Sequence, residues 1–164
     1  MASGSAGVKV QNTQVIDPLV AALVDLTGFL ASPQRDEALL REAGVSLDRA
    51  LFPLLVRLGA AGSLGVAALA DAAGRDHTTV SRQLAKLGEL GLVERLGAKD
   101  RRLRAARLSA TGEAMVAAIT AARRRVLARA LADWSDADAR SLAALNRRFA
   151  DALVGVAHGR EPPD

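Results

Sequence analysis

Residues 75–108 constrain the fold of this chain more than any other stretch. The stretch begins with short polar residues, continues with apolar residues at helical spacing, and reaches a glycine at Gly91. Two short apolar runs follow, and a turn rich in cations separates them. This order predicts a helix followed by a β-hairpin, which is the arrangement of a recognition helix and its wing.

The positive charge of the chain is concentrated in the same stretch. Residues 75–108 contain nine Lys and Arg against four Asp and Glu, a balance of about +5, whereas the whole chain of 164 residues carries +4. The rest of the chain is therefore close to neutral. A localised cationic surface favours a polyanionic partner, and together with the helix-and-wing pattern it indicates double-stranded DNA.

Composition narrows the fold class and the chemistry. Half of the residues are apolar and only 2% are aromatic, so a core must consist mainly of Ala, Leu and Val, which favours packed helices. The chain has no cysteine and only two histidines, which excludes disulfides, zinc fingers and sensing by thiols. We expect no metal site and no cofactor, although a site made only of carboxylates remains open.

The sequence contains no motif that supports catalysis. A nucleophile elbow, a phosphate-binding loop and a paired-carboxylate motif are all missing. Asp76, His77 and Ser81 contain the residue types of a hydrolytic triad, but the first two are neighbours at a helix start, where their side chains diverge. We therefore expect that the protein is not an enzyme.

The expected elements follow from helical spacing, caps and turn residues. Asp17 is the expected cap of the first helix with Pro18 in its first turn, and Ser46 is the expected cap of the third, which contains Pro53. Gly59 to Gly65 is expected to be a loop that includes at most a very short strand. The elements predicted are helices over 15–31, 35–43, 47–58, 66–73 and 77–90, strands over 92–96 and 104–108, and helices over 112–134 and 136–157.

This order predicts a mainly α fold with a small β-wing: a winged helix-turn-helix core flanked by N- and C-terminal dimerisation helices. The flanking helices have more apolar surface than one small lobe can cover, which predicts a homodimer. The N-terminus has no signal-peptide pattern and no apolar run of membrane-spanning length is free of charge, so we expect a cytoplasmic protein. The expected divisions are a disordered segment 1–12, dimerisation helices 13–45, the DNA-binding domain 46–110, dimerisation helices 111–158 and a flexible tail 159–164.

The helix predicted from His77 has two different faces. Val80, Leu84 and Leu87 recur at core spacing, while the opposite side is short and polar and lets the backbone approach a major groove. Arg82 is the long donor on that side, able to reach guanine or a phosphate. The simpler interpretation is an ordinary solvated helix face. The expected DNA contacts on this helix are His77, Thr78, Thr79, Ser81, Arg82 and Lys86.

The basic turn of the wing supplies a second set of expected contacts. An Asp among cations can hold an Arg by a bidentate pair, which would preorganise that Arg for a narrow minor groove. A solvated loop is again the simpler interpretation. The residues expected to contact DNA here are Lys99, Asp100, Arg101, Arg102 and Arg104.

Residues 79–113 resemble the recognition helix and wing of MarR-type winged-helix transcriptional regulators. Their sequence is TVSRQLAKLGELGLVERLGAKDRRLRAARLSATGE. The matching features are D-x-T-V-S-R at 76–82 with one extra residue, Leu87 to Arg95 around Gly91-Leu92-Val93, Asp100-x-Arg102, and Leu108-Ser109-x-x-Gly112. The resemblance implies a homodimer on a pseudo-palindromic operator, joined by the first helix and the last two. It also implies that Arg102 enters the minor groove and that Asp100 anchors it.

Many proteins of that family are repressors released by small, often aromatic anions, and the resemblance implies a ligand cleft between the dimer helices and the winged lobe. A concave seam beside the long helix from Gly112 is a common place for such a ligand. A seam that is packed shut is an equal alternative. The residues expected near the ligand are Leu26, Leu30, Leu51, Leu55 and Met115, with Arg57 or Arg123 as partner of an anionic group.

Three functions therefore remain open. The first is a DNA-binding repressor released by a small anionic or apolar ligand. The second is a DNA-binding regulator without a ligand, controlled by its own abundance. The third is a winged-helix module for protein interactions, whose binding would depend little on salt.

Overall fold

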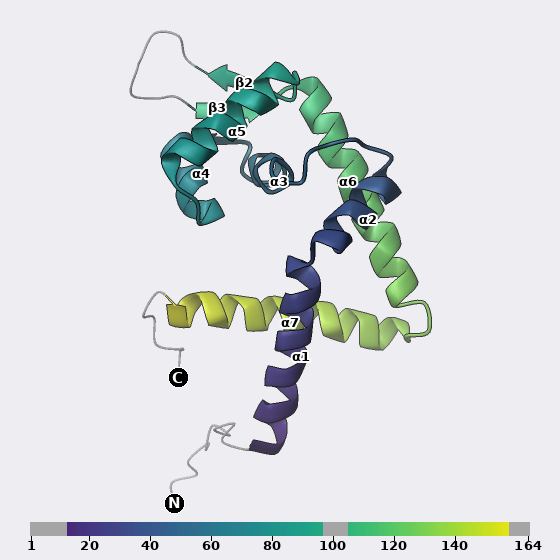
Figure 1. Cartoon of the computed structure of the whole chain (residues 1–164). Coiled ribbons are helices and arrows are strands. Elements are labelled where there is room, and N and C mark those ends of the chain that lie inside the picture. Colours follow the sequence, from purple (N-terminus) through teal and green to yellow (C-terminus); the bar gives the residue numbers. More distant parts are fainter. Residues whose placement is uncertain (1–12, 97–104, 158–164) are drawn as a thin grey trace, which may run out of the picture. The chain divides into compact units, whose positions relative to one another are not determined.

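The computed structural model describes residues 13–96 and 105–157 (Figure 1). The chain divides into two compact units, one formed by Phe29–Val126 and the other by the described parts of Met1–Gly28 and Leu127–Asp164. The elements are α1 (Thr13–Ala31), α2 (Pro33–Ala43), α3 (Phe52–Ala61), β1 (Ser63–Gly65), α4 (Val66–Ala73), α5 (His77–Glu89), β2 (Val93–Leu96), β3 (Ala105–Leu108), α6 (Ala110–Ala130) and α7 (Asp136–Ala157). The expected fold class, mainly helical with a small β-wing, is confirmed.

The strands form one antiparallel sheet in the order β1-β3-β2. Val93 pairs with Leu108 across β2 and β3, and Leu64 pairs with Ala106 across β1 and β3. The hairpin agrees with the sequence prediction, and the very short strand allowed for between residues 59 and 65 is β1. Strand β1 pairs with β3, and each of the three residues of β1 has a partner in β3.

The core of the winged lobe is an aliphatic cluster between α3, α4, α5 and the sheet. The largest fully buried side chains in it are leucines and Val80, in keeping with the near absence of aromatics in the chain. Each buried leucine contributes roughly 1.5–3 kcal/mol relative to an exposed one. The cluster consists of Leu51, Leu54, Leu55, Leu58, Leu69, Ala70, Val80, Leu84, Leu87, Leu92, Val93, Ala106 and Leu108.

A second cluster joins α2, α3 and α6. Leu39 and Leu40 from α2 pack with Phe52 from α3 and with Ile119 and Ala122 from α6. The half-buried Met115 packs against both clusters. Helix α2 and most of α6 therefore belong with the winged lobe by contact, although the expected boundaries at residues 45 and 110 separate them from it. The functional division at those boundaries stays a prediction.

The start of α3 differs from the expectation of a helix capped by Ser46. Residues 45–48 are irregular, and the helix begins at Phe52 and continues to Ala61. The side chain of Asp48 accepts from the backbone N–H of Ala50 at 2.7 Å, and its carbonyl accepts from the N–H of Leu51 at 2.9 Å. This local turn replaces the first part of the expected helix. Pro53 then lies in the first helical turn, where no N–H donor is needed.

The bounds of α1 and α6 also differ from expectation. Helix α1 begins at Thr13, so Pro18 lies inside the helix and Asp17 is not its cap. Helix α6 ends at Ala130 rather than near Trp134, and a turn leads to α7, whose cap is Ser135. Among the described residues, one window, Gln14–Ala31, is long and apolar enough to cross a membrane by length and composition alone. That window contains Asp17 and Asp25, and it is not buried within the chain.

The junction between the sheet and α6 depends on one small residue. Ser109 caps α6 by accepting from the N–H of Gly112 at 3.1 Å, and its own N–H donates to the carbonyl of Leu92 at 3.0 Å. Gly112 is buried, and a Cβ added there would overlap the backbone oxygen of Leu92. The glycine in the L-S-x-x-G motif is therefore required by close backbone approach.

We predict that Gly112→Ala lowers the free energy of unfolding by about 1–3 kcal/mol, because the added methyl group must displace backbone rather than a flexible side chain. Urea unfolding followed by circular dichroism measures the effect. The control is Gly155→Ala in α7, where a Cβ meets no atom within 4 Å. That variant should be neutral or stabilising, because alanine favours helices. Equal stability of the Gly112→Ala variant and the wild type would contradict the steric argument.

Candidate nucleic-acid interface

The start of α5 is held by a charged cap. Gly74 ends α4 with a positive φ of 60°, and two residues later Asp76 accepts from the N–H of Thr79 at 2.8 Å. Hydrogen bonds from Thr79 lower the pKa of Asp76 below the ordinary aspartate value of 3.8. The cap that the sequence predicts is therefore present and remains ionised at neutral pH. It leaves His77 as the first residue of the helix.

The two faces of α5 agree with the sequence prediction. Val80, Leu84 and Leu87 are buried. The residues predicted to contact DNA lie off this stripe, where Thr79 is half-buried and the others are exposed. Those exposed are His77, Thr78, Ser81, Arg82 and Lys86. The polar face is therefore accessible to a partner along the length of the helix.

One of the predicted cations has a partner within the helix. The Nζ of Lys86 lies 3.0 Å from an Oε of Glu89, and both side chains are mostly exposed. Such exposed pairs contribute little to stability, so this pair can exchange for a phosphate contact. Arg82 has no described ion pair, and its guanidinium is exposed. It is the strongest candidate for a base contact on α5.

The wing is described only at its strands. Lys99, Asp100, Arg101, Arg102 and Arg104 lie outside the described residues, so their contacts stay predictions. On the strands, Arg107 donates to the carboxylate of Glu94 at 2.9 Å and 3.1 Å, which pairs β3 with β2. Both of these side chains are about half exposed.

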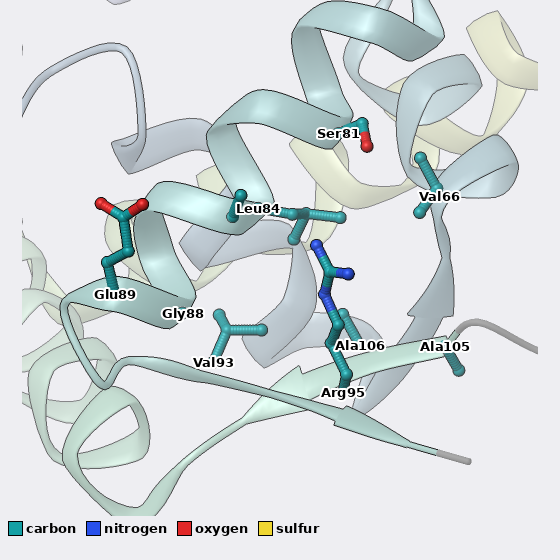
Figure 2. Close-up of a pocket in the computed structure, with 10 residues that line it drawn as sticks. Val66, Ser81, Leu84, Gly88, Glu89, Val93, Arg95, Ala105 and Ala106 are labelled. Atoms are coloured by element: carbon teal, nitrogen blue, oxygen red, sulfur yellow. The ribbon is translucent and has the colours of Figure 1, made fainter. Parts of the chain in front are cut away.

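A hollow of about 340 Å³ lies between α5 and the sheet (Figure 2). Ser81, Ala85 and Gly88 line it from α5, and Arg95 extends into it from β2. The sequence-based prediction did not include Arg95 among the contacts. The signal was present, because Arg95 follows the buried Val93 by two residues and alternate strand residues share a face. Arg95 therefore adds a cation between α5 and the sheet.

The residues predicted to bind a ligand lie in different environments. Leu51 and Leu55 belong to the buried core of the winged lobe, and Met115 is half-buried between the two clusters. Leu26 and Leu30 are exposed on α1. The seam itself would involve both units and stays a prediction. Among the described residues, no group of three or more His, Asp or Glu could hold a metal ion.

The two arginines predicted near the ligand have partners in the protein. The Nε of Arg57 donates to the carbonyl of Ala72 at 2.8 Å. The guanidinium of Arg123 lies 5.5 Å from the ring centre of Phe52. Burial, and secondly the charge of Arg35, lower the pKa of Arg123. Of the two, Arg123 is the one partly removed from water, which makes an anion more favourable beside it.

We predict that the cap of α5 depends on the ionised form of Asp76. Because the pKa is lower in the folded chain than in the unfolded chain, the cap stabilises fully above the unfolded value and is lost as pH falls through the folded value. Asp76→Ala should lower the melting temperature at pH 7. Asp76→Asn should lower it much less, since asparagine also caps helices. Thermal unfolding between pH 2 and 7 tests this. A pH profile of the Asn variant identical to that of the wild type would argue against the linkage.

Comparisons with known proteins show which sequences and folds this chain is similar to. A family model described as HVO_A0114 matches residues 47–106, which is less than half of the chain and includes α3, β1, α4, α5, β2 and the first half of β3. No curated protein sequence matches the chain. A MarR family protein from Bacillus stearothermophilus has a similar structure, with a TM-score of 0.76, 22% identity, and coverage of 88% of this chain and 99% of that one.

Two further solved structures are similar. RV1404 from Mycobacterium tuberculosis has a TM-score of 0.65 at 22% identity, covering 92% of this chain and 98% of that one. The multiple antibiotic-resistance repressor (MarR) from Listeria monocytogenes has a TM-score of 0.61 at 16% identity, covering 87% and 97%. At these identities the likeness is one of fold. The chain has the MarR-like winged-helix fold that its recognition-helix and wing motifs indicate.

Proposed function

We propose that this protein is a sequence-specific regulator of transcription that binds double-stranded DNA through α5 and the wing. The observation that carries the proposal is the polar face of α5, which is capped at Asp76 and exposed along its length beside a hollow that contains Arg95. A helix of this kind fits a major groove with its N-terminal residues toward the bases. Solved proteins of this fold include one named as a repressor, which supports a role in transcription regulation.

The wing completes the proposed interface. Lys99, Arg101, Arg102 and Arg104 would contact phosphates and the minor groove, with Asp100 as anchor of Arg102. This part of the proposal comes from the sequence and the resemblance. Of the described cations, Arg82 would reach the major groove from α5, and Arg95 would lie between α5 and the wing.

We further propose that the protein acts as a homodimer. Within a single chain, no residue of Gln14–Ala31 in α1 or of α7 is buried. Most of their large apolar side chains are 39–67% exposed, including Val24, Phe29, Leu145 and Val156, whereas Leu23 and Phe149 are half-buried. Apolar surface of this extent on two long helices indicates an interface, and a second copy of the chain presents the same surface. Two recognition helices would then read two half-sites.

Repression, release by a small ligand and a cytoplasmic location complete the proposal. A ligand would act by favouring a spacing of the two recognition helices that no longer matches one turn of DNA, about 34 Å. The half-buried Arg123 is the described cation best placed to favour an anionic ligand. Titration of aliphatic and aromatic carboxylates into the protein–DNA complex decides between ligand control and control by abundance. Catalysis has no part in this function.

We predict that the protein selects a pseudo-palindromic site from random duplex DNA and binds it with a steep salt dependence. Each phosphate neutralised contributes roughly −0.9 to the slope of log K against log salt, so several cations per subunit give a slope of about −4 or steeper. Arg82→Ala should weaken binding to the selected site by about 1–3 kcal/mol per subunit. Fluorescence anisotropy across a salt series measures both quantities.

The control for this experiment is Arg148→Ala, which removes one exposed cation from α7. If Arg82 reads a base, its loss relaxes the preference at one position of the site, whereas loss of a phosphate contact weakens all sequences alike. A flat salt response would exclude the DNA-binding function and favour a protein-interaction module.

We predict that Leu145→Asp converts the dimer to a monomer or makes the chain insoluble. Leu145 is 61% exposed in the single chain, and a charge buried there without a partner would cost several kcal/mol. Sedimentation velocity at micromolar concentration measures the change. Ala144→Asp is the matched control, because it adds the same charge to α7 outside the apolar stripe that contains Leu142, Leu145 and Leu153, and it should leave the dimer intact. A folded wild-type monomer at this concentration would refute the dimer.

A further inference from the structure

Arg75 joins the recognition helix to a segment far away in the sequence. It lies in the turn between α4 and α5, directly before the capping Asp76. Its Nη1 donates to the carbonyl of Ala50 at 3.0 Å and to the Oε1 of Gln83 at 2.8 Å. Ala50 lies just before α3, and Gln83 lies in the middle of α5. One guanidinium nitrogen therefore bridges these two elements.

A second arginine makes the reverse connection. Arg57 in α3 donates through Nε to the carbonyl of Ala72, which is in the last turn of α4. Carbonyls in the last turn of a helix lack partners within that helix, so this donor satisfies one of them. Two hydrogen bonds thus connect the end of α4 and the turn before α5 to the α3 region: Arg57 donates from α3 to Ala72, and Arg75 donates from the turn to Ala50.

These bonds supply a constraint that the apolar core does not. Val80 and Leu87 pack α5 against leucines, and apolar attraction has no preferred direction. Hydrogen bonds do have one, since they weaken steeply away from a narrow range of distance and angle. Gln83 is half-buried, and along α5 it lies between the buried residues Val80 and Leu87. A hydrogen bond to its amide oxygen therefore resists rotation of α5 about its own axis.

Base reading requires such a constraint. Binding groups must be held within about 0.5 Å of their productive geometry, or contacts are lost although the site is still present. Rotation of α5 would move Ser81 and Arg82 together, because both lie on the same rigid helix. Phosphate contacts made by long, flexible cations tolerate such a movement better than contacts to base edges do.

We propose that Arg75 is a positioning residue that sets the rotation of α5, and thereby the discrimination between operator and other DNA, without contacting DNA itself. This inference rests on the proposed DNA-binding function. The competing explanation is that Arg75 is one more phosphate contact. The two explanations differ in what happens when the acceptor on α5 is removed and no charge is lost.

The experiment compares Arg75→Met, Gln83→Leu and the double variant with the wild type. Each is assayed for affinity to the selected operator, affinity to a scrambled duplex of the same length, and the salt slope of both. Arg41→Met is the matched control, because Arg41 is an exposed arginine in α2 for which no side-chain hydrogen bond is described. Circular dichroism confirms that each variant is folded at the assay temperature.

We expect both single variants to reduce the ratio of operator to scrambled affinity by about fivefold or more, as expected when one base contact is made imperfectly. The scrambled affinity and the salt slope should stay at the level of the Arg41→Met control. The double variant should be no worse than either single variant, because all three break the same bridge. A normal operator-to-scrambled ratio in Gln83→Leu would overturn the proposal. So would a salt slope for Arg75→Met that is shallower by about one than that of the control, since that marks a phosphate contact.

Failure of the proposed function and failure of this inference give different results. If the wild type selects no DNA sequence, the DNA-binding function fails. The bridge is then tested in the free protein by hydrogen exchange of the α5 amides. Faster exchange in Arg75→Met and Gln83→Leu than in Arg41→Met supports a role in holding α5, and equal exchange in all three overturns it.

Discussion

Burial of the apolar stripe of α5 against α3 is the contact on which the rest of this structure depends. Val80 and Leu87 are fully buried against leucines such as Leu55 and Leu58. Because the stripe occupies one side of the helix, its burial leaves the polar side of α5 exposed. The hydrophobic effect alone therefore presents the surface proposed to read DNA. Loss of this packing would expose the core and remove the interface together.

Small residues determine how closely the elements around this core approach each other. Gly112 lets the start of α6 meet the backbone of Leu92, and the Ser109 cap joins the same two elements by hydrogen bonds. Ala85 and Gly88 keep the hollow between α5 and the sheet open.

The charges on the proposed interface contribute little to the stability of the chain. The pairs Lys86–Glu89 and Arg107–Glu94 are exposed, and water and salt screen such pairs. These charges are therefore available for a partner. Arg75 differs, because it is half-buried and donates to two acceptors within the protein. A cation in the basic stretch is thus not by itself a DNA contact, and its partners decide its role.

The sequence by itself determined the order of elements, the cap at Asp76 and the two faces of α5, because spacing and capping are local properties of the chain. It also placed Gly91 just after α5, where the backbone has a positive φ of 68°. It did not determine the start of α3, where the turn at Asp48 competes with helix formation. Strand alternation indicates that Arg95 shares a face with Val93, but only the tertiary structure decided that this face lies beside α5 and that Arg75 bridges Ala50 and Gln83. The physical reason is that these contacts join residues whose proximity arises only when the core has packed.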